Sequence, residues 1–218
     1  MLGVLAHEMR TPIAAILGYQ ELLAEGIFGK VDPRGQEPLA RIAYSARQLL
    51  NLIDGVQEVM SPPEKRLEVH SEIFDPGTKL RECIENATTD AQGRNVQLAD
   101  DVERDLPSVN ADPERFCRAI DLALAAAIKT SHGSTLHVGA QSNNGKLEIV
   151  ISGTALEPDR DDPPIGVLKK GSPVELTGAG LRLAIVRHLA AQMSGDLKLE
   201  PVDGRTSVIL QMPAYDGV

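Results

Sequence analysis

The sequence predicts an α-helical hairpin that pairs into a dimeric four-helix bundle and is followed by an α+β sandwich domain. Residues 1–60 space their apolar side chains in a heptad pattern, which is typical of long packed helices. From about residue 66 onward the apolar pattern alternates as in half-buried strands, and helix candidates interrupt it. With 218 residues, of which 42% are hydrophobic, the chain is long enough for two domains with their own cores.

The first domain, assigned to residues 1–62, is predicted as two long helices joined by a turn. Alternating spacings of three and four residues relate the apolar positions Leu2, Leu5, Met9, Pro12, Ile16, Tyr19 and Leu23, and likewise Leu39, Ile42, Ala46, Leu49, Ile53, Val56 and Met60. Between them, "EGIFGKVDPRGQ" contains glycines and a proline that can reverse the chain. Further apolar residues widen the first helix's face beyond a two-helix seam, so we expect a homodimer through residues 1–60.

The second domain is assigned to residues 66–218, because the prolines of "SPPEK" end the second helix. Strands are predicted in "LEVHSEIF", "NVQLA", "TLHVGA", "KLEIVIS", "DLKLE" and "TSVILQMP". Helices are predicted from Asp75-Pro76 to near Gly93, from Asp112-Pro113 to about Thr130, and from Leu181 to Ser194. We therefore expect a mixed sheet with helices on one face. Residues 157–177, rich in proline and without periodicity, are predicted as a lid or a disordered segment.

Composition narrows the classes of function. A net charge of -9 without a run of basic residues argues against nucleic-acid binding and favours protein partners. Cys83 and Cys117 both fall in predicted helices, so we expect two core thiols in a reducing, cytoplasmic setting. The start has no positive region before its apolar residues, and the longest apolar window, 119–128, is roughly half a membrane span. Any membrane segment would therefore lie upstream of Met1.

The stretch "HEMRTP", residues 7–12, places reactive groups on one helical turn. In the heptad frame His7 lies opposite the apolar seam and faces solvent, with Thr11 one turn on and Glu8 beside it. A neutral imidazole is a good nucleophile, and a carboxylate such as Glu8 can fix which ring nitrogen is free to attack. The Thr11 hydroxyl could hold a water that attacks a phosphorylated His7, and Pro12 predicts a bend in the helix.

Two plainer interpretations of this histidine remain. A single exposed histidine on a polar helix face is often without any function, and the helical zinc signature needs a second histidine where Thr11 stands. The other histidines are expected at element ends (His70 and His132), on the solvent side of a strand (His137) and on the polar face of the third helix (His188). None has a second ligand at metal spacing, so no metal site of the protein's own is predicted.

"HEMRTP" resembles the phosphoacceptor box of bacterial two-component sensor histidine kinases, whose usual form is H-E-[LMI]-R-[TS]-P. "ILGYQELL", "GIFG" and "ARQLLNLIDGV" are similar to the dimerisation and phosphotransfer hairpin of that family, and "TGAGLRLAIVRHLAAQMSG" resembles its Bergerat-type ATP-binding domain. The resemblance implies that His7 is the phosphorylated residue, Glu8 the acid/base partner and Thr11 the residue that supports phosphatase action. It also implies a response regulator receiver domain as partner.

The nucleotide boxes depart from the family pattern. "AAIK" puts Ala126 where N-A-I-K has the magnesium-binding asparagine, and a methyl group offers no oxygen to the ion. "SGTALEP" puts Ser152 in place of the adenine-binding aspartate of D-x-G-x-G, with Thr154 and Leu156 at its glycines. "GAGLRL" keeps the phosphate-binding pattern except at Arg182, although a glycine pair can equally be a tight turn before a helix. A vestigial nucleotide site at Gly178, Gly180, Leu181 and Lys129 is expected, with weak use of ATP and magnesium.

Three functions follow from these patterns. The leading hypothesis is a signalling protein that carries phosphoryl groups on His7 between receiver aspartates, as a phosphotransferase and phosphatase with impaired autokinase activity. The second is an active ATP-dependent sensor histidine kinase with divergent nucleotide boxes. The third is a non-catalytic scaffold that binds receivers.

Overall fold

The architecture was analysed in a computed structural model, which describes residues 2–60, 69–131, 133–156, 178–202 and 204–215. The chain divides into two compact units, Met1–Arg66 and Leu67–Val218, and each is described by itself. The predicted lid, residues 157–177, and His132 lie outside the described residues.

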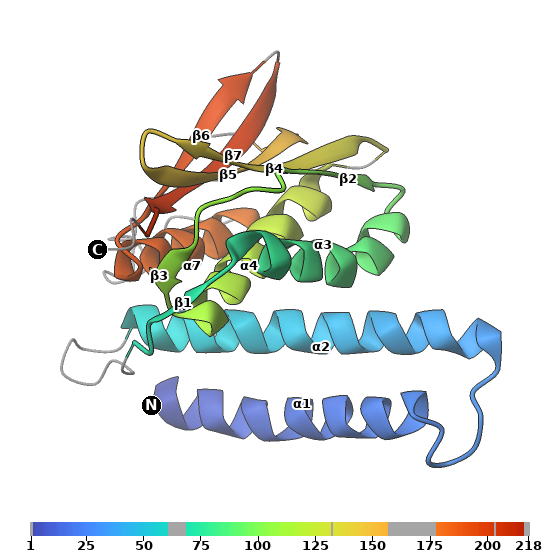
Figure 1. Ribbon diagram of the computed structural model, residues 1–218. Coiled ribbons are helices and arrows are strands. Elements are labelled where there is room, and N and C mark those ends of the chain that lie inside the picture. Colours follow the sequence, from blue (N-terminus) through green and yellow to red (C-terminus); the bar gives the residue numbers. More distant parts are fainter. Residues whose placement is uncertain (1, 61–68, 132, 157–177, 203, 216–218) are drawn as a thin grey trace. The chain divides into compact units, whose positions relative to one another are not determined.

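The first unit is a helical hairpin of α1 (Leu2–Ala24) and α2 (Pro33–Met60), which lie side by side and antiparallel (Figure 1). Gly26 and Gly29 in the connection adopt φ values of 75° and 111°, which other residues rarely reach, and so the chain can turn there. On α1, Ala6 and Ile13 are buried. Arg10 joins the helices through Asp54 and a 3.3 Å hydrogen bond from its Nη2 to Gln57 Oε1.

The heptad positions of α1 do not form the contact with α2 that a single hairpin seam would require. Met9, Ile16, Tyr19 and Leu23 are all exposed, Tyr19 by 65% of its surface. The buried residues Ala6 and Ile13 do not belong to the heptad positions. The heptad spacing thus predicted the helices, but its apolar face is left on the outside of one hairpin.

The second unit has a mixed sheet with helices over one face, as predicted (Figure 1). In the described residues the strands run in the order β2 (Gln97–Val102), β4 (Thr135–Asn143), β5 (Lys146–Thr154), β7 (Arg205–Pro213) and β6 (Asp196–Val202). The β2–β4 pair is parallel and the remaining pairs are antiparallel. The helices are α3 (Pro76–Gln92), α4 (Pro113–Thr130) and α7 (Gly178–Gln192).

A small antiparallel pair precedes this sheet. It consists of β1 (Glu72–Phe74) and β3 (Val109–Ala111). β1 is shorter than the predicted strand "LEVHSEIF", and β3 was not predicted, because three residues are too few to display an alternating pattern.

The core of the second unit lies between the sheet and the helices. Inward-facing residues alternate along β4 and β5, where Leu136, Val138, Leu147 and Ile149 are at most 1% exposed. The middle of α4, residues 119–128, is the longest apolar window of the sequence and is buried except at Asp121. Of the helices that the structure describes, none joins the length and the apolar character that a membrane span requires.

The prediction for His188 was wrong. It was expected on the polar face of the third helix, but it is only 7% exposed, and its Nε2 lies 2.8 Å from Gln192 Nε2. α7 packs against α4 and also contacts β6 and β7, so most of its circumference is covered. Its neighbour Arg187 reaches out of this packing and donates from Nη2 to the carbonyl of Leu197 at 3.3 Å.

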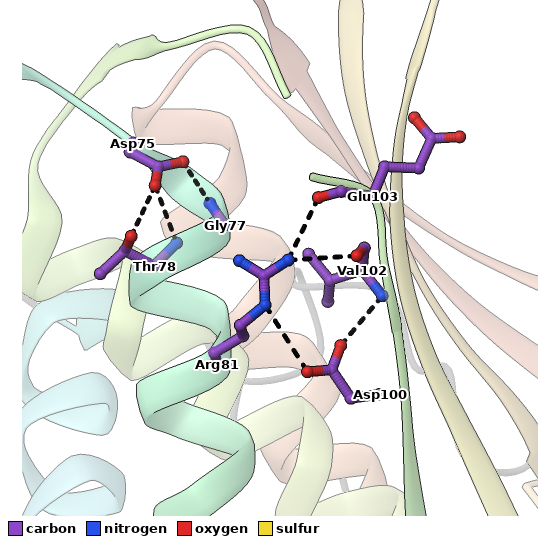
Figure 2. Close-up of polar contacts among 7 residues, drawn as sticks. All are labelled: Asp75, Gly77, Thr78, Arg81, Asp100, Val102 and Glu103. Atoms are coloured by element: carbon purple, nitrogen blue, oxygen red, sulfur yellow. Dashed lines mark hydrogen bonds and ion pairs between the residues drawn. The ribbon is translucent and has the colours of Figure 1, made fainter. Parts of the chain in front are cut away.

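Asp-Pro pairs start α3 and α4, as predicted. Asp75 caps α3 by accepting hydrogen bonds from the amides of Gly77 (2.9 Å) and Thr78 (3.2 Å), and Asp112 caps α4 in the same way. Figure 2 shows that Arg81, farther along α3, reaches the end of β2 and donates from Nη2 to the carbonyls of Val102 and Glu103. The Arg81 Nε also lies 3.6 Å from Asp100 Oδ2. These contacts fix α3 to an edge strand.

Replacing Asp75 by Ala is expected to lower the free energy of unfolding by about 1 kcal/mol at pH 7, because two amides of α3 lose their acceptor. The Thr78 hydroxyl and the two amides hold the pKa of Asp75 below its usual value of 3.8. The cap therefore stabilises above the usual pKa and is lost as the pH falls through the lowered one. Urea unfolding should show a wild-type advantage that shrinks below about pH 3.8. Asp75→Asn is the control, and an advantage that persists in acid would contradict this account.

Candidate functional site

His7 lies on the outer surface of the hairpin. Its side chain is exposed, and so are those of Glu8 and Thr11. The helix positions it there because Ala6, directly before it, and Ile13 occupy the buried side of α1. An imidazole in this position can be reached by a phosphoryl group on another protein.

Thr11 lies on the same side of α1 as His7, one turn farther along. Its Oγ1 donates to the backbone carbonyl of His7 at 3.3 Å. A hydrogen bond of this length is weak, so the hydroxyl can exchange it for a water molecule at little cost. Adjacent helix residues do not face each other, and Glu8 therefore flanks His7 without lying over it.

Pro12 lies inside α1, and the helix continues past it to Ala24. Proline lacks an amide hydrogen, so the carbonyl of Glu8 loses the helical hydrogen bond that residue 12 would otherwise donate. The predicted bend at this turn stays a prediction.

Sequence reasoning missed the role of Arg10. This residue of the "HEMRTP" stretch links the reactive turn to Asp54 and Gln57 of α2. A basic residue on one helix and an acidic residue on the other are a signal for such a link, but only once the register of the two helices is known.

The hairpin also carries an exposed apolar face. Ile16 of α1 and Ile42 and Leu49 of α2 are 48%, 46% and 42% exposed. They border a groove of about 400 Å³ in the hairpin, whose lining is Ile13, Ile16, Arg41, Ile42, Ser45, Ala46 and Leu49. Apolar residues that remain exposed together on one surface are typical of an interface.

In the second unit the structure brings together some of the residues predicted for a nucleotide site. Lys129 ends α4 and Gly178 begins α7, and a Cβ added to Gly178 would lie 2.9 Å from the Lys129 ammonium nitrogen. Gly180 and Leu181 follow in the first turn of α7, the former buried and the latter half-buried. Arg182, which stands where the family pattern has glycine, donates from Nη1 to the Gly178 carbonyl at 2.7 Å.

In the "SGTALEP" segment, which stands where the family has D-x-G-x-G, side chains and hydrogen bonds fill the space. Gly153 has a φ of 85°, and a Cβ there would meet the Thr135 carbonyl oxygen at 2.8 Å. The Thr154 hydroxyl donates to the Thr206 carbonyl at 2.6 Å, and the Thr206 hydroxyl donates to the Leu156 carbonyl at 2.7 Å. Thr154 and Leu156 are 0% and 3% exposed. Two positions that the pattern reserves for glycine are thus filled by buried side chains.

A nucleotide bound with magnesium does not fit these residues. Ala126 is 0% exposed and presents only a methyl group, whereas magnesium requires oxygen ligands. Ser152, in place of the aspartate, lies on β5 opposite His137. In the described part of the chain, no group of three or more His, Cys, Asp or Glu residues could hold a metal ion. We therefore derive no reaction step through ATP and magnesium.

Comparison with known proteins relates the chain to histidine kinases. Residues 1–61 match the His Kinase A (phospho-acceptor) domain family. The chain is 27% identical over 216 residues to the sensor-like histidine kinase R01002 of Rhizobium meliloti. This match covers 96% of the chain and 41% of R01002. The chain is also 27% identical to the histidine protein kinase DivJ of Caulobacter vibrioides, covering 97% of this chain and 36% of DivJ. The chain thus spans about two fifths of these relatives.

Solved structures share the fold. ShkA, whose full-length structure is in complex with AMPPNP, superposes with a TM-score of 0.64 at 24% identity, over 98% of this chain and 45% of ShkA. The histidine kinase AdeS of Acinetobacter baumannii superposes with a TM-score of 0.58 at 18% identity, over 96% of this chain and 98% of that one. A helical hairpin followed by a sheet domain is therefore the arrangement found in histidine kinases.

Proposed function

We propose that this chain carries phosphoryl groups on His7 between the aspartates of receiver domains. Two findings support this: residues 1–61 match a phospho-acceptor domain family, and the chain is similar to sensor histidine kinases over nearly its whole length. The exposure of His7 on a continuous helix supports this proposal most directly, because transfer requires the imidazole to meet a group held by another protein. Glu8 and Thr11 are the proposed helpers.

Transfer needs only groups of this chain and of its partner. A neutral ring nitrogen of His7 attacks the phosphorus of a receiver's aspartyl phosphate, so that a P–N bond forms and the P–O bond to the aspartate breaks. Glu8, the next residue on α1, is the group proposed to take up or orient the proton on the other ring nitrogen. The reverse step returns the phosphoryl group to a second receiver. We propose that the receiver brings the magnesium for this step.

Incubation of the protein with a panel of receiver domains, each phosphorylated with labelled acetyl phosphate, tests the proposal. We expect label to leave at least one receiver and to appear on this chain in an acid-labile form, as a phosphohistidine is. If no receiver loses label faster with the chain present, and the chain gains none, the proposal is wrong.

Thr11 is proposed to support dephosphorylation of the receiver. Its hydroxyl donates to the His7 carbonyl on the same side of α1, and this position supports a role in holding the attacking water. Thr11→Ala is expected to slow the release of inorganic phosphate from a phosphorylated receiver by about 10- to 100-fold, as loss of one hydrogen bond to the reacting water predicts. Transfer to His7 should stay within about threefold. Thr11→Ser keeps the hydroxyl and is the control; equal loss in both variants would point to a structural role.

We also propose that the chain forms a homodimer through the apolar face of the hairpin, with Ile16, Ile42 and Leu49 at its centre. Changing both Ile16 and Leu49 to Glu is expected to weaken association by at least about 100-fold. Each substitution removes an apolar contact from the interface and also requires a carboxylate to lose its water on association, which costs further free energy. Sedimentation velocity at several concentrations measures this. Gln36→Glu adds a charge at an exposed position of α2 and should leave the dimer intact. A wild-type monomer at all concentrations would contradict the proposal.

An ATP-dependent kinase is the second candidate. The approach of Lys129 to Gly178 at the start of α7 favours it, since a cation beside a helix N-terminus suits a phosphate. The buried Ala126 and Leu156 oppose it.

A further inference from the structure

The two cysteines of the chain meet between neighbouring helices. Cys83 lies on α3 and Cys117 on α4, 34 residues apart in sequence, and the Cys83 sulfur is 4.0 Å from the Cys117 carbonyl oxygen. The two thiols are close enough for each to shift the pKa of the other. Cys83 is 3% exposed, whereas Cys117 is only partly buried. A small oxidant can therefore reach the Cys117 sulfur, whereas the Cys83 sulfur is buried.

The surroundings make the two thiols chemically unequal. Interaction with the Cys117 side chain, followed by burial, raises the pKa of Cys83, while interaction with the Cys83 side chain lowers the pKa of Cys117 against the opposing effect of burial. The ammonium of Lys79 also favours the Cys117 thiolate, and the carboxylates of Asp121 and Glu82 oppose it. A partly exposed cysteine with a lowered pKa beside a buried thiol is the pairing typical of a redox-sensing cysteine and its resolving partner.

We propose that Cys83 and Cys117 form a reversible disulfide in response to hydrogen peroxide, a modification separate from the proposed phosphoryl transfer on His7. The Cys117 thiolate attacks a peroxide oxygen, so that an S–O bond forms, the O–O bond breaks and hydroxide leaves to become water. The Cys83 thiol then attacks the Cys117 sulfur; the S–S bond forms, the S–O bond breaks, and the hydroxyl leaves with the Cys83 proton as a second water. Two thiols are oxidised and one peroxide is reduced to water.

The helices are positioned to allow this closure. α3 is fixed at its start by the Asp75 cap and by Arg81, two residues before Cys83 (Figure 2). α3 and α4 pack against each other, and the Cys83 sulfur lies 4.0 Å from the Cys117 backbone carbonyl across this contact. In a reducing compartment such a bond is transient, which is the usual character of a regulatory disulfide. It would tie α3 to the helix that carries Ala126 and Lys129.

Oxidation of the full chain tests the proposal. The reduced protein is treated with an equimolar amount of hydrogen peroxide, alkylated under denaturing conditions and measured by intact mass. We expect the mass to fall by two hydrogens, with both cysteines protected from alkylation, and a thiol reductant should reverse this. Closing the loop should raise the melting temperature of the second unit by about 5 to 10 °C.

Single variants separate a poised pair from chance oxidation. Cys83→Ala should leave a sulfenic acid on Cys117 that dimedone traps, whereas Cys117→Ala should consume peroxide about 10-fold more slowly than the wild type. Asp121→Asn should speed the reaction and Lys79→Met should slow it, because their charges act on the Cys117 thiolate in opposite directions. A wild type that stays fully reduced, or whose disulfides link separate chains, would overturn the proposal, as would equal peroxide consumption in both alanine variants.

Discussion

His7→Gln is expected to abolish phosphoryl uptake from a phosphorylated receiver, with a loss of more than about 1,000-fold in initial rate. A carboxamide nitrogen is not nucleophilic, and the neighbouring Thr11 hydroxyl donates to the residue-7 carbonyl at 3.3 Å and is a far weaker nucleophile than an imidazole. Because His7 is exposed, the substitution should change the free energy of unfolding by less than about 0.5 kcal/mol. Transfer of label from receiver to chain, followed over time on neutral gels, measures the rate.

A matched control is available one residue away. Glu8→Gln keeps the shape of the side chain and removes the carboxylate, so transfer should slow by about 10- to 100-fold but not vanish. If His7→Gln retained wild-type transfer, His7 would not be the group that carries the phosphoryl. If Glu8→Gln were as inactive as His7→Gln, Glu8 would be essential and not merely a helper.

The second large effect concerns the nucleotide. We expect ATP with magnesium to leave His7 unlabelled, and nucleotide affinity to be about 100- to 10,000-fold weaker than in a kinase with intact boxes, as the loss of two recognition contacts predicts. Removing magnesium with a chelator should change the affinity little, because Ala126 offers the ion no ligand. Calorimetric titration with and without magnesium measures both quantities.

Any residual nucleotide binding should depend on Lys129. Lys129→Met is expected to weaken it, because its ammonium lies beside Gly178 at the start of α7, whereas Lys198→Met, an equal change of charge on exposed β6, should not. Labelled phosphate on His7 from ATP and magnesium alone would instead establish an autokinase. A strong dependence of affinity on magnesium would show that other residues supply the missing ligand.

Much of the fold could be predicted because its signals are local. The pairs Asp75-Pro76 and Asp112-Pro113 each predict the start of a helix from two adjacent residues. In the structure, each aspartate is the N-cap of a helix. Alternation likewise marked β4 and β5. Which element covers a given face is not a local property, and there the sequence analysis was wrong for His188, which is buried because α7 has neighbours on several sides. The heptad face of α1 is exposed in one hairpin, as its width suggested.

The site was predictable only in part for the same reason. "HEMRTP" and its heptad frame place His7 on the outside, where the structure has it. The sequence shows that Ala126 and Ser152 replace the expected nucleotide-binding residues. It does not show how the surrounding side chains pack as a result. Thr154 and Leu156 are buried, and the Thr154 hydroxyl donates to the Thr206 carbonyl. This packing depends on a contact between strands about 50 residues apart in the sequence, which local patterns do not reveal. The link from Arg10 to Asp54 depends in the same way on the register of two helices.

The central claim is that an exposed imidazole on α1 receives the phosphoryl group. The most direct measurement is mass spectrometry of the chain, digested at neutral pH after incubation with a phosphorylated receiver. We predict the added phosphoryl on the peptide that contains His7, with fragment ions that assign it to the imidazole and with its loss on mild acid treatment. A phosphoryl group on any other residue, or none on the chain while the receiver transfers normally to a known histidine phosphotransfer protein, would contradict the account.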